Sequence, residues 1–237
     1  MYEIEATHWW FRCLHELVIN NLKKYQIDFP NILDAGCGTG RLMFQIQNMG
    51  KISGFDFRDT ALTYCRKRNL NNLQKVDLNS WDPVESQFDF IISLDVISDK
   101  GILDDKLIVK KFYKALKPGG KLIMHIPAFP FLKRKHDQGA TIKKRYLKNE
   151  LKEIARWTGF TPICIKYRLF FATPIFIIIK LIDSFFLKSK GSNTDMFKLP
   201  SLANWFFLKL GRLENISIMN GFSPPFGTSL FSILQKS

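Results

Sequence analysis

Cysteine and histidine are scarce in this sequence of 237 residues, which contains four of each. The cysteines form no Cys-x-x-Cys pair, and the scattered histidines add no metal-ligand spacing; the four thiols belong to Cys13, Cys37, Cys65 and Cys164. We therefore expect a reduced, metal-free protein without a disulfide framework.

Targeting signals and repeats are also missing. The N-terminus, Met-Tyr-Glu-Ile-Glu, has neither the basic region nor the apolar region of a signal peptide. The sequence contains no internal repeat and no low-complexity tract. These absences predict a cytoplasmic location.

Acidic residues are in the minority. Asp and Glu total 21 against 35 Lys and Arg, which gives a formal net charge of +14 and an isoelectric point near 9.7. Such a balance favours a negatively charged partner or surface, and both nucleic acid and an anionic membrane qualify. The length suits one α/β domain with an insertion, or a domain and a half.

A glycine-rich turn follows the first strongly apolar run. Residues 32–40 read Ile-Leu-Asp-Ala-Gly-Cys-Gly-Thr-Gly, which predicts a strand that meets a helix through a tight loop. Gly36, Gly38 and Gly40 allow positive φ and leave the backbone bare, so a ligand can approach the N-terminus of the next helix. The same spacing occurs in turns that bind nothing, so the neighbouring segments decide.

A second apolar run, residues 52–57, carries Asp56 near its end, 22 residues after Asp34. An acid at this place in a nucleotide-binding βαβ unit binds ribose hydroxyls. Because Asp34 stands ahead of the first glycine, Leu-Asp-Ala-Gly-Cys-Gly-Thr-Gly resembles the first motif of class I S-adenosylmethionine-dependent methyltransferases. A dinucleotide-binding loop is the less similar alternative.

The resemblance implies S-adenosyl-L-methionine as cofactor and S-adenosyl-L-homocysteine as product. Asp77 follows a third strand, where this family binds the adenine amino group, and Leu78 stands where the family packs a side chain on the ring. A solvated turn is the alternative for Asp77. The expected cofactor-binding residues are Asp34, Gly36, Cys37, Gly38, Gly40, Asp56, Phe57, Asp77, Leu78, Leu94, Asp95, Trp10 and Arg12.

The fold class that the resemblance implies is α/β, a Rossmann-like seven-stranded methyltransferase sheet with an antiparallel last strand. Expected strands are 31–35, 51–56, 73–76, 88–94, 120–126, 160–167 and 227–235, and expected helices include 8–25, 60–68, 103–117 and 147–158. Residues 88–94 are nearly all apolar, as in a central parallel strand, and Asp95 stands at its ligand-binding end. The expected domains are an N-terminal lid helix (1–29), the methyltransferase domain (30–168 with 226–237) and a hydrophobic helical insertion (169–225).

The first expected helix opens with Thr7-His8-Trp9-Trp10-Phe11-Arg12, an unusually dense group of aromatic side chains. Many methyltransferases of this type begin with a similar His-aromatic-aromatic-Phe-Arg stretch, which implies a lid over the cofactor. The alternative is a helix whose aromatic side chains cover an edge of the sheet.

Residues 127–160 resemble a methyltransferase subgroup that has His-Asp, Gly-His and Arg-Arg-Tyr in this segment. The matches here are His136-Asp137 and Lys144-Arg145-Tyr146, whereas Thr141-Ile142 replaces Gly-His and Ile97-Ser98-Asp99 replaces a Glu-His pair after the fourth strand. We expect His136 and Tyr146 as catalytic residues and Lys144, Arg145 and Tyr146 as substrate-binding residues, with Lys143 adding charge for an anionic head group. A solvated basic loop is the alternative for residues 133–136.

Residues 169–187 are almost wholly apolar and approach the length of a bilayer span. One crossing would put the last strand on the wrong side of the membrane, and the later apolar stretch, 202–213, is too short and polar for a second. We therefore expect an interfacial helix with a narrow polar stripe, or a buried cap helix.

These features favour a methyltransferase that acts on a small, hydrophobic or lipid-linked acceptor, with O- or N-methylation and a peripheral membrane contact. An alternative is a non-catalytic S-adenosylmethionine-binding or membrane-surface interaction protein, which the departures Asp99 and Ile142 motivate. A nucleic-acid methyltransferase is a third hypothesis from the charge alone, but no Asn-Pro-Pro-Tyr-like motif follows the fourth strand, so no nucleic acid is expected.

Overall fold

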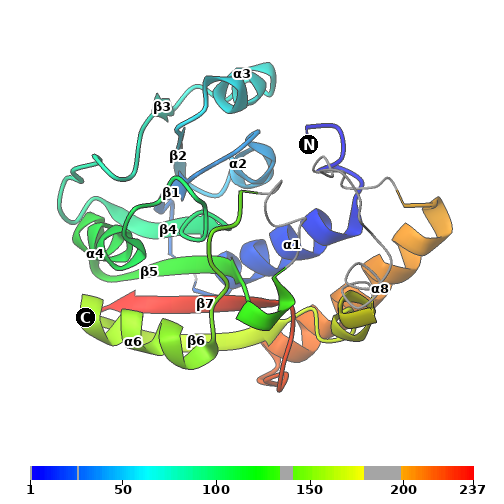
Figure 1. The fold of residues 1–237 in the computed structure, drawn as a ribbon. Coiled ribbons are helices and arrows are strands. Elements are labelled where there is room, and N and C mark those ends of the chain that lie inside the picture. The colour runs from blue at the N-terminus through cyan, green and yellow to red at the C-terminus, as the bar shows by residue number, and fades with distance from the viewer. Residues whose placement is uncertain (1, 26, 134–140, 179–198) are drawn as a thin grey trace.

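The computed structural model describes residues 2–25, 27–133, 141–178 and 199–237. Its centre is one sheet of seven strands in the order β3-β2-β1-β4-β5-β7-β6 (Figure 1). The strands are β1 (Asn31–Ala35), β2 (Lys51–Asp56), β3 (Leu73–Lys75), β4 (Phe88–Leu94), β5 (Leu116–Pro127), β6 (Phe160–Arg168) and β7 (Ser229–Lys236).

The strand pairing confirms the predicted methyltransferase topology. Strands β1 to β5 pair in parallel, whereas β7 lies between β5 and β6 and runs antiparallel to both. Strand β7 is therefore part of the sheet, although the insertion separates it from β6 in the sequence. The β1 and β4 side chains are almost all buried, as expected for central parallel strands covered on both faces.

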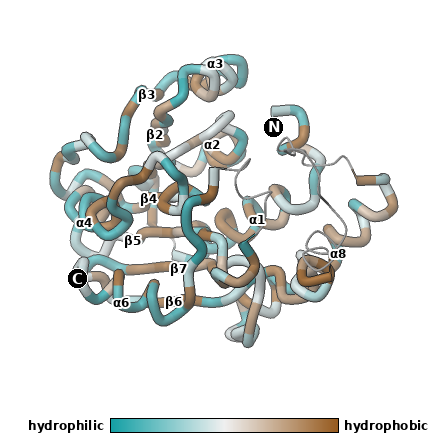
Figure 2. Tube along the Cα trace, viewed as in Figure 1, coloured by the Kyte–Doolittle hydropathy of each residue, from teal (hydrophilic) through white to brown (hydrophobic). Residues whose placement is uncertain are grey.

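Helices cover both faces of the sheet. Helices α4 (Asp105–Ala115) and α6 (Lys148–Thr158) pack on one face. Helices α1 (Trp9–Lys24), α2 (Arg41–Ile46) and α3 (Asp59–Lys67) pack on the other. Figure 2 shows the central strands as largely hydrophobic and the outer turns as more hydrophilic.

Helix α4 is shorter than predicted, and β5 begins earlier. The prediction placed a helix over 103–117 and a strand over 120–126, but the helix ends at Ala115 and Leu116 is already extended and paired with Phe88. Pro118 disfavours the helical conformation at Lys117, the residue before it, and the pairing of Leu116 with Phe88 holds Leu116 extended. At the other end Asp104 caps the helix by accepting a hydrogen bond from the Leu107 N–H at 3.1 Å.

The insertion contains a long helix, α8 (Ser201–Met219), which lies beside α1 (Figure 1). Asn204 of α8 accepts a hydrogen bond from the first N–H of α1, at Trp9, at 2.8 Å. Asn215 donates to the Cys13 carbonyl at 2.7 Å. Residues 173–178, ahead of α8, are helical. The apolar stretch 169–187 therefore becomes helical at residue 173, and its remainder from 179 lies outside the described residues.

Candidate active site

The glycine loop between β1 and α2 is held open toward the carboxyl edge of the sheet. Gly36 and Cys37 donate their N–H groups to the Phe55 carbonyl at 2.8 and 2.9 Å, which ties the loop to β2. Gly36 has φ +87°, and a Cβ there would lie 2.4 Å from Val96, so only glycine fits. Gly38 has φ +55° and open space where a side chain would stand, which leaves bare backbone for a ligand.

Asp56 joins this loop to the end of β2. One carboxylate oxygen accepts a hydrogen bond from the Gly38 N–H at 3.0 Å, and the other accepts from the Arg58 N–H at 2.9 Å. The side chain is almost fully buried, while the next residue, Phe57, is 65% exposed. Asp56 is therefore a fixed acceptor beside an exposed aromatic ring at the edge where ligands of parallel sheets bind.

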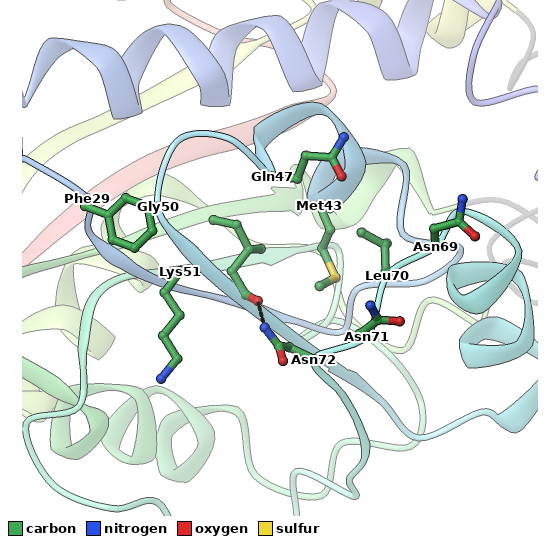
Figure 3. Close-up of a pocket in the computed structure, with 10 residues that line it drawn as sticks. Phe29, Met43, Gln47, Gly50, Lys51, Asn69, Leu70, Asn71 and Asn72 are labelled. Carbon is green, nitrogen blue, oxygen red and sulfur yellow. Dashed lines mark hydrogen bonds between the residues drawn. The ribbon is translucent and has the colours of Figure 1, made fainter.

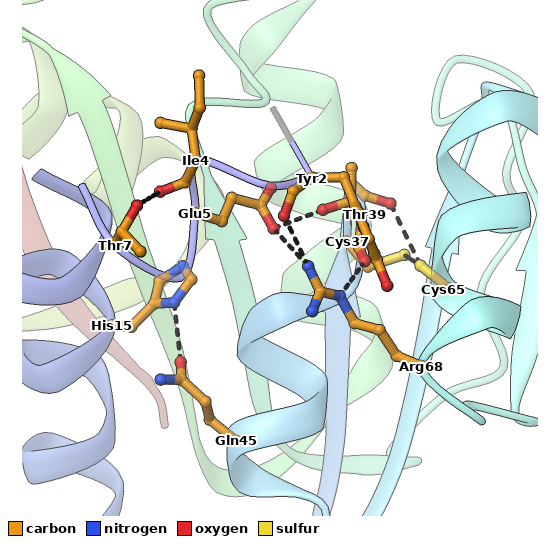
Figure 4. A network of polar contacts seen from close by, with 11 residues as sticks. Tyr2, Ile4, Glu5, Thr7, His15, Cys37, Thr39, Gln45, Cys65 and Arg68 are labelled. Atoms are coloured by element: carbon orange, nitrogen blue, oxygen red, sulfur yellow. Dashed lines mark hydrogen bonds and ion pairs between the residues drawn. The ribbon is translucent and has the colours of Figure 1, made fainter. Parts of the chain in front are cut away.

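The N-terminal segment lies across the glycine loop, and the sequence reasoning missed its contacts (Figure 4). The Thr39 hydroxyl donates to the buried Glu5 carboxylate. Arg68 donates to the Thr39 carbonyl at 2.9 Å and to the Tyr2 carbonyl at 3.2 Å, and its guanidinium lies 4.1 Å from the Tyr2 ring centre. The residues around Glu5 carry no local pattern that indicates this contact.

Three carboxyl groups gather under the loop. Burial, with Asp56 and Glu5 nearby, raises the pKa of Asp34 to about 7. Burial also raises the pKa of Glu5, although Thr39 and Arg68 oppose the change. Close carboxylates disfavour one another's charge, so a cationic ligand would relieve this cluster.

Asp77 and Leu78 differ in exposure. Asp77 is exposed and accepts hydrogen bonds from the backbone and side chain of Asn79, both at 2.9 Å. Leu78 is 7% exposed and packs in the core with α4. Asp77 is accessible to a ligand in this position, whereas the contact predicted between Leu78 and the adenine ring stays a prediction.

Asp95, just after β4, pairs with a histidine that the sequence reasoning did not select. Its two carboxylate oxygens lie 2.9 and 3.1 Å from His125 Nδ1, and the His125 ring meets the Trp10 ring edge-on at 5.5 Å. Leu94 pairs with His125 across β4 and β5. Trp10 and Arg12 are partly exposed on α1, and the contact with His125 places Trp10 at this edge, whereas the role of the helix as a lid stays a prediction.

The three residues predicted to bind substrate are engaged within the protein. Lys144 forms ion pairs with Asp105 at 2.9 Å and Glu150 at 2.7 Å. Arg145 donates to the Ala128 carbonyl at 3.1 Å. Tyr146 is fully buried and donates to the Asp105 carboxylate at 2.8 Å, and burial with this acid raises its pKa. These contacts describe structural links between β5, α4 and α6 and give no support to the predicted roles, which stay predictions.

The two departures from the resembled subgroup lie side by side. Asp99 and Ile142 form an isolated antiparallel bridge, and the Thr141 hydroxyl donates to the Asp99 carboxylate. Lys143, beside them, donates its ammonium to the Ile102 carbonyl at 2.9 Å. His136, predicted as a catalytic base, lies outside the described residues.

A hollow of about 350 Å³ lies away from this edge, between the end of α2 and the loop at 69–72 (Figure 3). Its lining includes Met43, Lys51 and Asn72. Lys51 begins β2, so the hollow is at the amino end of that strand, opposite the end that carries Asp56. It is separate from the site described above.

The sequence profile of the family described as "Methyltransferase domain" matches residues 30–162, more than half of the chain. The chain belongs to this methyltransferase family. It is a class I methyltransferase, and its cofactor is S-adenosyl-L-methionine. The glycine loop fits this cofactor, because it offers bare backbone at Gly38 next to an acidic cluster that suits a cationic sulfonium.

Similar proteins agree with the family assignment of this methyltransferase. The chain is 29% identical over 136 residues to a ubiquinone biosynthesis O-methyltransferase of Idiomarina loihiensis, a match that covers 49% of this chain and 54% of the relative. The matched region therefore spans about half the length of that curated relative.

Solved structures share the fold. A possible histamine N-methyltransferase from Thermotoga maritima has a TM-score of 0.59 at 18% identity, with 100% of this chain and 93% of that chain covered. A phosphoethanolamine N-methyltransferase from Haemonchus contortus, in complex with S-adenosyl-L-methionine, has a TM-score of 0.58 at 18% identity, with 92% and 51% covered.

Among the helices of the described ranges, none combines the length and apolar character that a bilayer crossing requires. No group of three or more His, Cys, Asp or Glu side chains within those ranges is placed to hold a metal ion.

Proposed function

We propose that this methyltransferase transfers the methyl group of S-adenosyl-L-methionine to the hydroxyl or amine of a hydrophobic or lipid-linked acceptor while resting on a membrane surface. The main support for this proposal is the apolar outer face of α8, the helix that packs against the aromatic start of α1. A small polar acceptor would need no such surface.

The cofactor is proposed to lie over Gly36 to Gly40, with Asp56 on the ribose and Asp77 near the adenine. The bound sulfonium supplies an activated methyl group. Asp56 accepts from hydroxyls because its carboxylate is charged and fixed, and the acids around Asp34 favour a cation. The contribution of the protein is then chiefly alignment of two reactants.

The acceptor is proposed to enter where α1 meets the insertion. The Trp9 ring lies 5.8 Å from the Phe171 ring and 5.4 Å from the Phe207 ring, so aromatic side chains from three segments gather there. Leu169 and Leu208 complete this apolar cluster. Such a wall suits the hydrocarbon or aromatic body of an acceptor.

One stripe of α8 faces away from the protein. Large apolar side chains recur there at three- and four-residue steps and are exposed: Leu202, Trp205, Phe206, Leu213 and Ile216. Lys209 lies on the same stripe, with its ammonium 5.8 Å from the Trp205 ring centre. An interfacial helix combines these features, because aromatic and leucine side chains enter the lipid boundary while a lysine meets anionic head groups.

Incubation with S-adenosyl-L-methionine and a lipid extract tests the reaction. Mass spectrometry should detect a product heavier by one methylene unit with the wild-type protein and not with D56A. If lipid extracts yield no such product and a water-soluble metabolite extract does, the acceptor is polar and the lipid part of the proposal fails.

Flotation with anionic liposomes tests the surface contact. The double variant W205S/F206S should float less than wild type, because each lost aromatic contact removes roughly 1.5–3 kcal/mol of burial. The matched control is V84S/L103S, which changes two similarly exposed apolar residues elsewhere and should float as wild type does. Equal flotation of both variants, or none by wild type at low salt, would contradict the membrane contact.

A further inference from the structure

Buried polar groups without partners collect on the α1 side of the sheet. Among the described residues, all three guanidinium nitrogens of Arg168 and Nε2 of His125 are buried and have no hydrogen-bond partner. Each of these two residues is 1% exposed. Buried polar groups are nearly always hydrogen-bonded, so two such groups in one region require an explanation.

The strand register brings Arg168 and His125 to one region. Arg168 pairs with Ser229 of β7, and Ser229 pairs with Pro127 of β5. His125 precedes Pro127 by two residues and therefore points to the same face of the sheet. The Ser229 hydroxyl is a further buried group without a partner there.

The charged and titratable groups that face Arg168 come from every neighbouring element. They are Cys13 and His15 on α1, Glu214 on α8 and Asp95 after β4. The Glu214 carboxylate oxygens accept hydrogen bonds from the N–H groups of Leu169 and Phe170. The Asp95 carboxylate oxygens contact His125. Burial lowers the pKa of Arg168, but an arginine remains charged in proteins, so a cation is held without an acceptor.

The pairing of Asp95 with His125 fixes the chemistry of the free nitrogen. A carboxylate at Nδ1 favours the tautomer that carries its proton there, which leaves the lone pair on Nε2. The site therefore offers one proton acceptor and several charge-assisted donors. Asp95 and Trp10 are partly exposed and mark the side from which a ligand can enter.

We infer that Arg168 and the Asp95–His125 pair form the acceptor site of this methyltransferase, and that the group they receive is a hydroxyl. The inference rests on the proposed function and narrows the acceptor atom to oxygen. The acceptor O–H bond breaks, its electron pair stays on oxygen, and the proton bonds to His125 Nε2. Arg168 holds the resulting oxyanion, Asp95 stabilises the imidazolium, and the proton later passes to water. The oxygen would then bond to the methyl carbon as the carbon–sulfur bond breaks, with that electron pair left on the sulfur of S-adenosyl-L-homocysteine.

An amine acceptor fits this arrangement less well. A neutral amine has one lone pair, which the new bond to the methyl carbon requires, so none remains to accept a hydrogen bond from Arg168. An oxygen has further lone pairs that accept from the guanidinium while one attacks. Oxyanion stabilisation by fixed donors is among the largest effects in catalysis.

Binding of 4-nitrophenol without cofactor tests the site, because the phenolate and the phenol absorb differently. The wild-type protein should bind the probe as phenolate at a pH where the free probe is largely protonated, and it should bind the methyl ether 4-nitroanisole more weakly. R168M should weaken phenolate binding by roughly tenfold to a hundredfold, the loss expected for a hydrogen bond to a charged group. H125Q should shift the bound probe back toward the phenol.

Stability and cofactor binding separate this role from a structural one. R168M should raise the urea midpoint, because it removes a buried unpaired charge, whereas the control R212M removes a cation that already pairs with Glu16 at 2.5 Å and should not. R212M should bind the probe as wild type does. S-adenosyl-L-homocysteine should bind all variants equally in calorimetry.

Two results would overturn the inference: no phenolate signal with wild type, or R168M that binds the probe unchanged. If R168M fails to fold, the spectrum of H125Q decides alone. If the wild-type protein does not bind S-adenosyl-L-homocysteine, the proposed cofactor site is wrong. Failure of the acceptor site and failure of the cofactor site are therefore distinguishable.

Discussion

Replacement of Asp34 by Asn should change how the stability of the protein depends on pH. The folded protein raises the pKa of this carboxyl from 3.8 to about 7. Between these values the native state binds the proton more tightly than the unfolded state, so the contribution of Asp34 to stability is largest below pH 4. It is lost as the pH rises toward 7, and it is constant above that.

The magnitude follows from the difference between the two pKa values. Each pKa unit corresponds to about 1.4 kcal/mol, so the change from 3.8 to about 7 corresponds to roughly 4 kcal/mol of destabilisation at pH 8. D34N keeps the shape of the side chain and cannot ionise. Its stability should equal that of the wild type near pH 4 and exceed it by up to that amount at pH 8.

Urea unfolding followed by tryptophan fluorescence from pH 4 to 8, without cofactor, measures this difference. Other acids titrate in both proteins, so the comparison between the two isolates Asp34. D59N, which changes an exposed acid, should parallel the wild type at every pH. Parallel curves for D34N and wild type would refute the reasoning, because the acid would then be solvated or paired in the folded protein.

Two further predictions concern single side chains. D56A should weaken S-adenosyl-L-homocysteine binding by about 2–3 kcal/mol in calorimetry, since it removes a charged acceptor and frees Gly38, and unchanged affinity would refute the ribose assignment. Y146F should lower the free energy of unfolding by about 1–2 kcal/mol, because it leaves the buried Asp105 contact unmade, with little effect on kcat. A large loss of kcat at unchanged stability would restore the predicted catalytic role of Tyr146.

The sheet was predictable because its strands carry local signals. The runs at 31–35, 51–56 and 88–94 agree with β1, β2 and β4, since buried parallel strands are apolar throughout and end on acids or glycines. The last strand was predicted because the resembled family has an antiparallel seventh strand, and the run at 227–235 agrees with β7. The α4–β5 boundary was predicted two residues too late, because the pairing of Leu116 with Phe88 forms only in the folded sheet.

The candidate site was predictable only in part. The glycine loop and Asp56 belong to one local pattern. The contact of Glu5 with Thr39, and the placement of Arg168 on the same face of the sheet as His125, arise only when the chain folds. Arg168 stood one residue beyond the predicted strand 160–167 and His125 stood inside another, so both looked structural. Cations that looked free in the sequence, such as Lys144, prove to pair with nearby acids.

Two groups of buried ionisable side chains, one acidic and one basic, lie at the same edge of the sheet. Acids lie under the glycine loop beside β1 and β2, and Arg168 lies beyond β5 at the end of β6. Each burial costs stability, which is expected where function rather than folding selects a residue. The acids suit a cationic cofactor, and the oxyanion inferred for the acceptor would offset the charge of Arg168. Asp95, which lies between them and contacts His125, connects the two groups, and this charge distribution supports the proposed transfer from a sulfonium to an oxygen nucleophile.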